Sequence, residues 1–432
     1  MRLRILLVNP WICDFAAYNL WARPLGLLKV AEFLSSFDAE LMLIDCTDSF
    51  KARQYGTGRF RSEPIEKPDL LKGIPRLYKR YGISDEEFQE QVWAAQPVDI
   101  VLITSVMSYW YPGVQSVIER LRAMLGDVPV ILGGIYPTLY PEHAARHSGA
   151  DFIFKGPINA GLTFALSTFG FKLKRKRAPL HYYELDLYRS YPFAPLLTST
   201  GCPFHCSYCA SHLLYDHYSR RPPTEVLHEV RALYALGVRD YAFYDDALLI
   251  DAACHIKPVL RLIIGEGLNV RFHTPNGLHA RYVDEELAWL LRKSNFITLR
   301  LSLETVNSER QKSTGGKVAS VDIKHAVMQL KKQGFTKKEL GAYLMYGLPG
   351  QYLEEVREGV AFLKSLGIRI NLTEFSPLRG TGCWDDLVEQ GIIDDDLDPL
   401  LTNNTVFSAL HAGYDPGAIA ALKLDVQRYN AS

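Results

Sequence analysis

The sequence predicts an α/β protein of two domains, in which a doubly wound parallel sheet precedes a partial (β/α)6 barrel. Two series of short apolar segments alternate with amphipathic helical patterns, and a basic segment separates the two series. This alternation is typical of parallel sheets that are covered by helices. The 432 residues are enough for two domains. We expect a first domain at 1–165, a linker at 166–190, the barrel at 191–384 and a C-terminal extension at 385–432.

The composition is that of an ordinary globular protein. Hydrophobic residues make up 48% of the chain and charged residues 22%, and Lys plus Arg equals Asp plus Glu at 48 each. Such a balance argues against a nucleic-acid partner, because nucleic-acid-binding domains usually carry a basic excess. No apolar segment approaches the ~20 residues of a membrane span, and no small-residue cleavage site follows the apolar N-terminus. We therefore expect a cytoplasmic protein without a membrane span.

The first series predicts five strands with helices between them. The strands are expected at Leu3–Asn9, Glu40–Asp45, Asp99–Thr104, Pro129–Gly134 and Asp151–Gly156. Apolar positions near the 3.6-residue period predict helices at Leu25–Ser36 and Gly113–Leu125. Residues from about 50 to 96 interrupt the alternation and are interpreted as an inserted, partly helical segment. In a sheet of this kind, a ligand is expected at the carboxyl ends of the strands.

The second series follows a basic segment, Phe171–Leu180, which we interpret as a solvated linker. Six strands are expected at Pro195–Thr200, Asp240–Asp246, Asn269–Asn276, Ile297–Thr305, Leu340–Gly347 and Arg369–Ser376. Helical patterns separate them at Thr224–Gly237, Ala252–Gly267, Asp284–Ser294, Val321–Gly334 and Leu353–Gly367. Six strand–helix repeats predict a barrel that is open where two units are absent. The chemistry of such barrels lies on loops at the carboxyl ends of the strands.

Three of the seven cysteines are clustered in one of these loops. Cys202, Cys206 and Cys209 lie within eight residues after the first barrel strand, whereas the other four cysteines are scattered. Three thiolates on one loop can hold an iron–sulfur cluster and leave one iron with an open position. Zinc is the alternative, because His212 would complete a Cys3His site. A disulfide among these cysteines is a weaker alternative in a reducing compartment.

The run CPFHCSYC resembles the signature of the radical S-adenosylmethionine superfamily, CxxxCxxC, with Tyr208 as the aromatic residue before the third cysteine. The resemblance implies a [4Fe-4S] cluster on Cys202, Cys206 and Cys209, with S-adenosylmethionine chelating the fourth iron. It also implies that the reduced cluster cleaves S-adenosylmethionine to methionine and a 5′-deoxyadenosyl radical. In such an enzyme the cofactor carries the chemistry, and the protein orients it and excludes water.

The resemblance extends along the barrel and implies further S-adenosylmethionine-binding residues. Asp245 and Asp246 end the second strand, where the superfamily holds the ammonium group of the cofactor. A helix N-cap pair is the alternative interpretation for these two aspartates. Ser302 and Glu304 end the fourth strand, where the superfamily contacts the ribose or the methionine portion.

The first domain resembles the cobalamin-binding domain that precedes many radical S-adenosylmethionine barrels. The resemblance rests on RPLGLLKVAEFL, ELMLID and ILGGIYPTLYPEHA, and it implies a flavodoxin-like fold. It implies that Ser105, Gly133 and Gly134 leave room for the nucleotide tail of cobalamin. No Asp-x-His-x-x-Gly run follows the first strand, so the histidine that ligates cobalt from below in the methionine-synthase type is absent.

These resemblances predict an enzyme that methylates an unactivated carbon with the help of cobalamin. Radical cyclisation or rearrangement without methyl transfer is the second prediction, and a non-catalytic iron–sulfur or cobalamin sensor is the third. The expected partners are a small-molecule or peptide substrate and an electron donor such as flavodoxin or ferredoxin. The sequence indicates no catalytic residue and does not identify the substrate.

Overall fold

The computed structural model describes residues 2–49, 56, 58–156, 158–176, 187–411 and 413–432. The chain divides into two compact units. Unit 1 comprises Met1–Tyr191 and Asp398–Leu401, and unit 2 comprises Pro192–Leu397 and Thr402–Ser432. The predicted linker at 166–190 falls partly on 177–186, outside the described residues.

Unit 1 contains the predicted doubly wound sheet. Its five strands are ordered β10–β9–β8–β1–β4, and all neighbouring pairs are parallel. Their bounds are β1 Leu3–Asn9, β4 Ala39–Asp45, β8 Ile100–Ile103, β9 Val130–Leu132 and β10 Phe152–Ile153. This is the flavodoxin-like order, because the first strand lies between the second and the third. In that order the ligand crevice lies beyond the carboxyl ends of the first and third strands, here β1 and β8.

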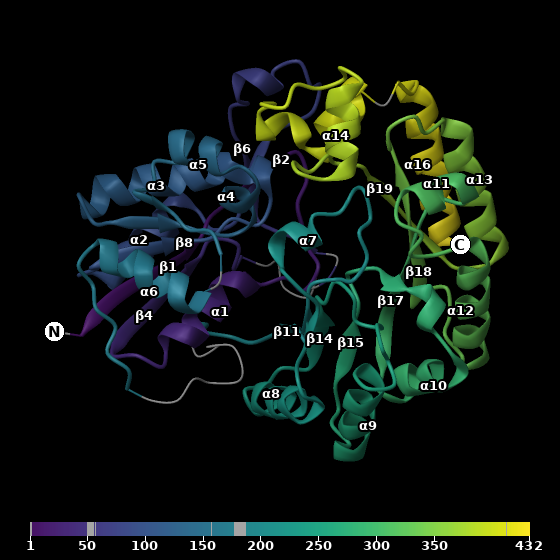
Figure 1. Cartoon of the computed structure of the whole chain (residues 1–432), viewed down its shortest axis with the longest axis horizontal. Coiled ribbons are helices and arrows are strands. Elements are labelled where there is room, and N and C mark those ends of the chain that lie inside the picture. Colours follow the sequence, from purple (N-terminus) through teal and green to yellow (C-terminus); the bar gives the residue numbers. More distant parts are fainter. Residues whose placement is uncertain (1, 50–55, 57, 157, 177–186, 412) are drawn as a thin grey trace. The chain divides into compact units, whose positions relative to one another are not determined.

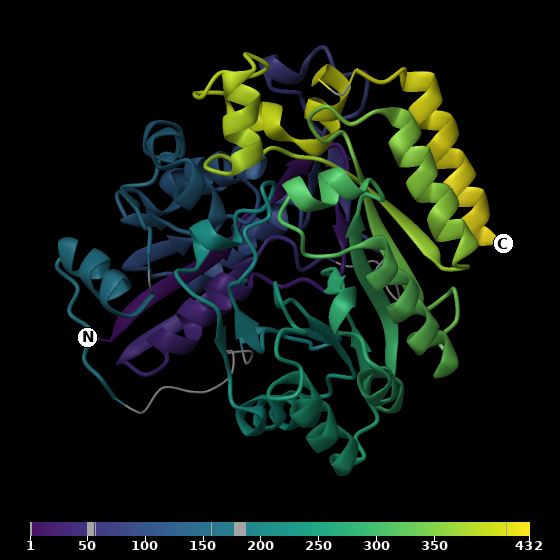
Figure 2. The same cartoon turned by 45° about the vertical axis from the view of Figure 1, so that its right-hand side comes forward.

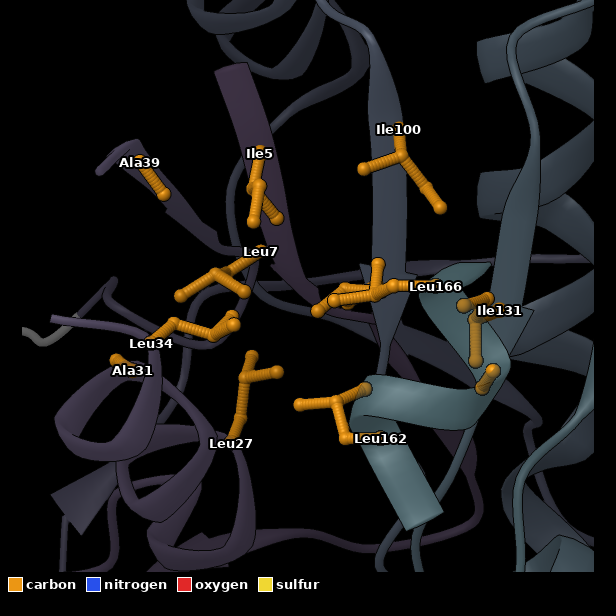
Figure 3. Close-up of a cluster of buried hydrophobic side chains, with 12 residues drawn as sticks. Ile5, Leu7, Leu27, Ala31, Leu34, Ala39, Ile100, Ile131, Leu162 and Leu166 are labelled. Carbon is orange, nitrogen blue, oxygen red and sulfur yellow. The ribbon is translucent and has the colours of Figure 1, made fainter. Parts of the chain in front are cut away.

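Helices pack on the sheet because alternate residues of each strand face opposite sides. Ile5 and Leu7 of β1 point toward Leu27 and Ala31 of α1, as Figure 3 shows. Leu162 and Leu166 of α6 join the same buried cluster (Figure 3). The helices of unit 1 are α1 Leu25–Leu34, α2 Asp85–Ala95, α3 Tyr111–Leu125, α4 Ile135–Leu139, α5 Pro141–His147 and α6 Ile158–Thr168.

The segment that was interpreted as an insertion is only partly irregular. Residues 50–55 and 57 lie outside the described residues. The short strands β6 (Ser62–Pro64) and β7 (Lys79–Tyr81) pair with β2 (Ile12–Asp14) in a three-stranded antiparallel sheet. Helix α2 packs against β4, so it continues the strand–helix alternation between β4 and β8. The segment was expected to be partly helical, but the polar residues at the start of α2 did not indicate that this helix continues the alternation; Ser84 and Glu87 form a capping box there.

Unit 2 contains the predicted partial barrel. Six parallel strands follow the order β11–β14–β15–β17–β18–β19, with the short strand β16 also paired to β17. Their bounds are β11 Phe193–Leu196, β14 Asp240–Phe243, β15 Arg271–His273, β16 Leu278–His279, β17 Phe296–Glu304, β18 Leu340–Tyr346 and β19 Arg369–Glu374. The predicted α/β fold class is therefore confirmed in both halves of the chain.

A helix follows each of the first five barrel strands and covers the outer face (Figure 1). These helices are α8 Pro223–Ala235, α9 Ile256–Glu266, α10 Glu285–Lys293, α12 Ser320–Lys332 and α13 Leu353–Ser365. After β19, the chain forms α14 Gly382–Glu389, α15 Asn404–His411 and α16 Pro416–Ala431. Helix α16 packs against α13 and β19, and Figure 2 shows α13 and α16 side by side. Within the described residues, no helix is long and apolar enough to cross a bilayer.

The first barrel strand is shorter than predicted. It ends at Leu196, and the backbone N–H groups of Thr198 and Ser199 donate to Asp245 instead of continuing the sheet. Helix α9 begins at Ile256 and not at Ala252, after a turn in which Asp251 has a φ of 48°. The first difference lies at the carboxyl end of a strand, where a side chain competes with the sheet for backbone donors.

Candidate functional site

The three clustered cysteines lie on a loop that is closed at its base. Strand β12 (Ser199–Thr200) pairs with β13 (Ser219–Arg220) in an antiparallel ribbon, and residues 201–218 form the loop between them. Gly201 has a φ of 75°, and a Cβ atom at this position would lie 2.7 Å from the carbonyl oxygen of His217. Only glycine fits both constraints. The ribbon therefore fixes where the loop leaves the barrel.

The three thiols are free and poorly exposed. Cys206 is buried, and Cys202 and Cys209 are half-buried. The backbone N–H of Cys209 donates to the carbonyl of Cys206 at 2.9 Å, which folds the loop tightly between the second and third cysteines. Burial raises the pKa of all three thiols, that of Cys209 to about 11, and Lys317 is a cation that lowers each of these values. The positive charge of Lys317 therefore acts on all three cysteines.

Two other strand ends contact the cysteine loop through side chains. Ser211 donates to Asp246, which follows β14, at 2.6 Å. The ring of Phe204, between the first two cysteines, meets the ring of His279 edge-on at 5.1 Å.

The turn after β19 reaches the same loop. The N–H of Cys383 donates to the carbonyl of Ser207 at 2.7 Å, and the side chains of these two residues lie 3.4 Å apart. The loop is therefore held from several strand ends, as a cofactor site at the mouth of a barrel requires.

Glu304 lies at the end of β17 and faces the same region. It has a φ of 65°, next to an irregular register between Ser302 and Glu304. Its carboxylate pairs with Lys317 at 2.7 Å, and the two side chains are 11% and 13% exposed. Tyr208 lines one small cavity together with Glu304 and Lys317. Burial raises the pKa of Tyr208 far above its usual value, and the Glu304 carboxylate raises it further.

The two adjacent aspartates after β14 have different environments. Asp245 is fully buried, and its Oδ1 atom accepts hydrogen bonds from the backbone and the hydroxyl groups of Thr198 and Ser199. Burial raises the pKa of Asp245 to about 6 despite these bonds. Its Oδ2 atom has no hydrogen-bond partner among the described residues. Asp246 accepts one bond, from Ser211. Asp245 therefore shapes the start of the loop, and Asp246 is the freer carboxylate.

Replacing Asp245 with Ala is expected to lower the free energy of unfolding of unit 2 by about 3 kcal/mol or more. Four buried donors would lose their acceptor, and each unsatisfied group costs about 1–3 kcal/mol. Asp246→Ala removes a single bond and should cost about 1 kcal/mol. Urea unfolding of the metal-free protein measures both losses, and equal losses would contradict the structural role of Asp245.

His279 is a buried histidine that the sequence did not single out. It is 4% exposed, and its Nδ1 atom has no hydrogen-bond partner among the described residues. Burial, together with the charges of Lys317 and Arg281, lowers its pKa to about 3. The imidazole is therefore neutral at pH 7. Its strand, β16, pairs with β17 at Ser302, which is itself buried.

The stability of unit 2 should depend on pH through His279. Because the folded-state pKa lies below the unfolded value of about 6.5, the unfolded chain binds the proton first. The contribution is present above pH ~6.5 and is lost as the pH falls toward about 3, by up to about 1.4 kcal/mol per pH unit. His279→Phe should flatten this slope in chemical unfolding curves. His325 is exposed, so His325→Gln is the control. An unchanged slope in His279→Phe would mean that the pH dependence does not come from His279.

In unit 1, the residues predicted to face cobalamin lie at the carboxyl edge of β8 and β9. Ser105 is buried, and its backbone pairs with Gly133 and Ile135. Gly134 has a φ of 102°, and a Cβ atom there would lie 2.4 Å from the carbonyl oxygen of Ser105. A Cβ atom on Gly133 would meet only Phe154, at 3.4 Å. The close backbone of Ser105 therefore requires a glycine at position 134. At position 133 a side chain could be accommodated, so the glycine there leaves room that a ligand could use.

One buried polar atom at the carboxyl edge of β8 is available to hydrogen-bond a ligand. The hydroxyl of Ser108 is buried and has no hydrogen-bond partner among the described residues. Trp110, in the aromatic run after β8, donates from its indole nitrogen to Asp14 at 2.7 Å and is held in place by that bond.

Lys317, Gly315 and His279 are the site residues that the sequence analysis missed. The one feature of the sequence that could have indicated Lys317 is the run Gly315-Gly316-Lys317. It follows Glu304, the carboxylate at the end of the fourth predicted barrel strand, after one short helical segment. A glycine pair followed by a cation suits a close approach of backbone to another loop, but nothing in the sequence says which loop.

The donor set fits the cluster that the cysteine spacing predicts. Three soft thiolates on one loop suit iron–sulfur ligation. Among the described ranges, no three His, Cys, Asp or Glu side chains are arranged around one metal position, and this includes the three cysteines, so the fit rests on thiol chemistry and on their shared loop. The exposed Asp246, the buried Ser302 and the Glu304–Lys317 pair supply polar groups around the loop for an organic cofactor.

Comparison with protein families matches both halves of the chain. Residues 196–363 match the Radical SAM superfamily, and residues 81–161 match the B12 binding domain. These are the two resemblances that the sequence indicated. Membership of these two families implies a [4Fe-4S] cluster, S-adenosylmethionine and cobalamin as the cofactors of this chain.

Individual relatives are distant. An uncharacterized methyltransferase from Pyrococcus horikoshii is 26% identical over 68% of this chain and 70% of its own length. The cytidylyl-2-hydroxyethylphosphonate methyltransferase of Streptomyces wedmorensis is 20% identical over 90% of this chain and 83% of its own. The solved structure of TsrM from Kitasatospora setae, a radical S-adenosylmethionine methyltransferase, has a TM-score of 0.68 at 18% identity. It covers 90% of this chain and 76% of its own, and it shares the fold.

Proposed function

Because the chain belongs to the radical S-adenosylmethionine superfamily and carries a B12-binding domain, we propose that it is a cobalamin-dependent methyltransferase that acts on an unactivated carbon. The observation that carries the proposal is the cysteine loop at the mouth of the partial barrel, braced from several strand ends. Both relatives named above carry methyltransferase names, which supports methyl transfer as the outcome. The substrate is a small molecule or a peptide.

Each group in the site has a part in this proposal. Cys202, Cys206 and Cys209 would hold the [4Fe-4S] cluster and leave a position for S-adenosylmethionine. When bound, the reduced cluster supplies the electron that cleaves S-adenosylmethionine, and cobalamin carries the methyl group. The electron comes from a low-potential donor of the flavodoxin or ferredoxin class.

The residues around the loop orient the S-adenosylmethionine. The carboxylate of Asp246 accepts from its ammonium group, because Asp245 is already occupied on one oxygen. Ser302 and Glu304 contact the ribose or the methionine portion, and Tyr208 packs beside them. In unit 1, Ser105, Gly133 and Gly134 border the nucleotide tail of cobalamin.

Product analysis of the reconstituted protein tests the proposal. The protein is loaded anaerobically with iron, sulfide and hydroxocobalamin, and is then given dithionite and S-adenosylmethionine. We expect both 5′-deoxyadenosine and S-adenosylhomocysteine, with the second product lost when cobalamin is omitted. Formation of 5′-deoxyadenosine alone would favour cyclisation or rearrangement. Neither product from a cluster-loaded protein would favour a sensor, and a zinc-containing protein without iron would refute the proposal.

A further inference from the structure

A short glycine-containing segment seats a lysine against the cysteine loop. After α11 (Ser308–Ser313), Gly315 and Gly316 both have positive φ values, 112° and 61°. A Cβ atom on Gly315 would lie 2.9 Å from the Cα and 3.3 Å from the Sγ of Cys206. The backbone of this segment therefore packs directly on the second cysteine. Lys317 follows two residues later.

The segment is fixed from its far side. Arg281 donates to the carbonyl oxygen of Gly316 at 2.5 Å. Gln311 donates to the carbonyl oxygen of Thr305, which follows β17, at 2.8 Å. The position of Lys317 is thus set by the fold and does not depend on a flexible surface loop.

Lys317 is paired with an opposite charge beside the thiols. Its Nζ atom lies 2.7 Å from Oε1 of Glu304 and 5.5 Å from the centroid of the Tyr208 ring. The two charged side chains are only 13% and 11% exposed, so solvent screens them weakly. Tyr208 is the direct neighbour of Cys209. A cation and an anion therefore lie together next to the cysteine loop.

Charge near an iron–sulfur cluster changes its reduction potential. Three thiolates make the site negative, and each electron added to the cluster makes it more so. A nearby cation stabilises the reduced state, and a nearby anion stabilises the oxidised state.

We infer that Lys317 and Glu304 form an opposed charge pair that sets the reduction potential of the cluster. This inference rests on the proposed binding of that cluster by Cys202, Cys206 and Cys209. The reaction concerned is the transfer of one electron from a low-potential donor to the oxidised cluster. Lys317 favours the reduced product, and Glu304 opposes it. Lys317 is thus a positioning residue, because it acts on the cluster through the field of its charge.

Opposite shifts in two single variants distinguish this role from a structural one. Lys317→Met leaves the Glu304 charge alone beside the cluster, so the midpoint should become more negative. At the wild-type midpoint, the ratio of reduced to oxidised cluster should fall about tenfold, which is about 59 mV for one electron. Glu304→Gln should raise this ratio about tenfold. The double variant, Lys317→Met with Glu304→Gln, should return to within about threefold of wild type, because both charges are gone.

The measurement is a dithionite titration of the reconstituted full chain without S-adenosylmethionine, followed by electron paramagnetic resonance. Lys312→Met is the control, since Lys312 is exposed on α11 and should leave the midpoint unchanged. Iron content is measured on every sample. A wild-type chain without iron would refute the proposed function itself. Normal iron with an unchanged midpoint in Lys317→Met would refute only the charge pair.

If Lys317→Met fails to bind the cluster, its midpoint cannot be measured, and the midpoint of Glu304→Gln then decides the test. A midpoint in that variant at or below the wild-type value would overturn the inference. Shifts of both single variants in the same direction would also overturn it, because a structural disturbance has no reason to follow the sign of the removed charge.

Discussion

Replacing Cys206 with Ala is expected to reduce the iron content of the reconstituted protein from about four atoms per chain to background. Cys206 is the buried member of the set, and Gly315 packs on its Cα atom. A water molecule or another side chain would need this space to replace the lost thiolate. The formation of 5′-deoxyadenosine should disappear together with the iron.

Two other cysteines are matched controls for this prediction. Cys254 is exposed and lies outside the loop, so Cys254→Ala should keep full iron content. Cys383 is buried against Ser207, so Cys383→Ala tests whether a fourth thiol contributes. Near-normal iron in Cys206→Ala would mean that the ligands are misassigned. Loss of iron in Cys383→Ala together with its retention in Cys206→Ala would transfer the ligand role to Cys383.

Replacing Gly134 with Ala is expected to destabilise unit 1 by about 3 kcal/mol or more. The residue has a φ of 102°, a conformation that costs a residue with a side chain about 1–3 kcal/mol. In addition, the new Cβ atom would lie 2.4 Å and 2.7 Å from the backbone oxygen and nitrogen of Ser105. Backbone atoms of a paired strand end cannot move away cheaply, so this overlap adds about 1–3 kcal/mol.

The neighbouring glycine provides the control. Gly133→Ala places a Cβ atom at an ordinary contact distance of 3.4 Å from Phe154, so the stability of unit 1 should change by less than about 1 kcal/mol. Thermal unfolding followed by circular dichroism compares the two variants. Retention of hydroxocobalamin after desalting gives a second readout. Equal stability of the two variants would mean that a side chain at position 134 does not clash with the backbone of Ser105. A stable Gly133→Ala variant that has lost cobalamin would support the proposed place of the nucleotide tail.

The strands were predictable because buried parallel strands form continuous apolar segments. Strand β1 has the predicted bounds, Leu3–Asn9, and the six barrel strands all lie where their apolar runs indicated. The elements that were predicted less well involve polar residues. Helix α2 begins with three acidic residues, and the end of β11 is determined by Asp245, which lies 47 positions from Thr198 in the chain. Such contacts have no local pattern.

The candidate site was predictable to the extent that its chemistry is local in sequence. Cys202, Cys206 and Cys209 occur on one loop, so their spacing alone was sufficient to indicate shared ligation. The partners of that loop come from distant parts of the chain, and they include Lys317 after α11 and His279 of β16. A lysine in a loop and a histidine in a short strand are common in any sequence. Only their burial and their proximity to the cysteines distinguish them.

The sequence by itself indicated the order of the two domains, the cluster of three cysteines and the superfamily, because these depend on residue type and on short spacing. The tertiary structure decided which charges remain available to a cofactor. It places Asp245 in four hydrogen bonds, leaves Asp246 with one, and pairs Glu304 with Lys317 beside the cysteine loop. It also packs Gly134 against the backbone of Ser105, whereas Gly133 has room for a Cβ atom in ordinary contact with Phe154. The physical reason is that hydrogen bonds, ion pairs and close contacts depend on distance in space, which the order of residues does not contain.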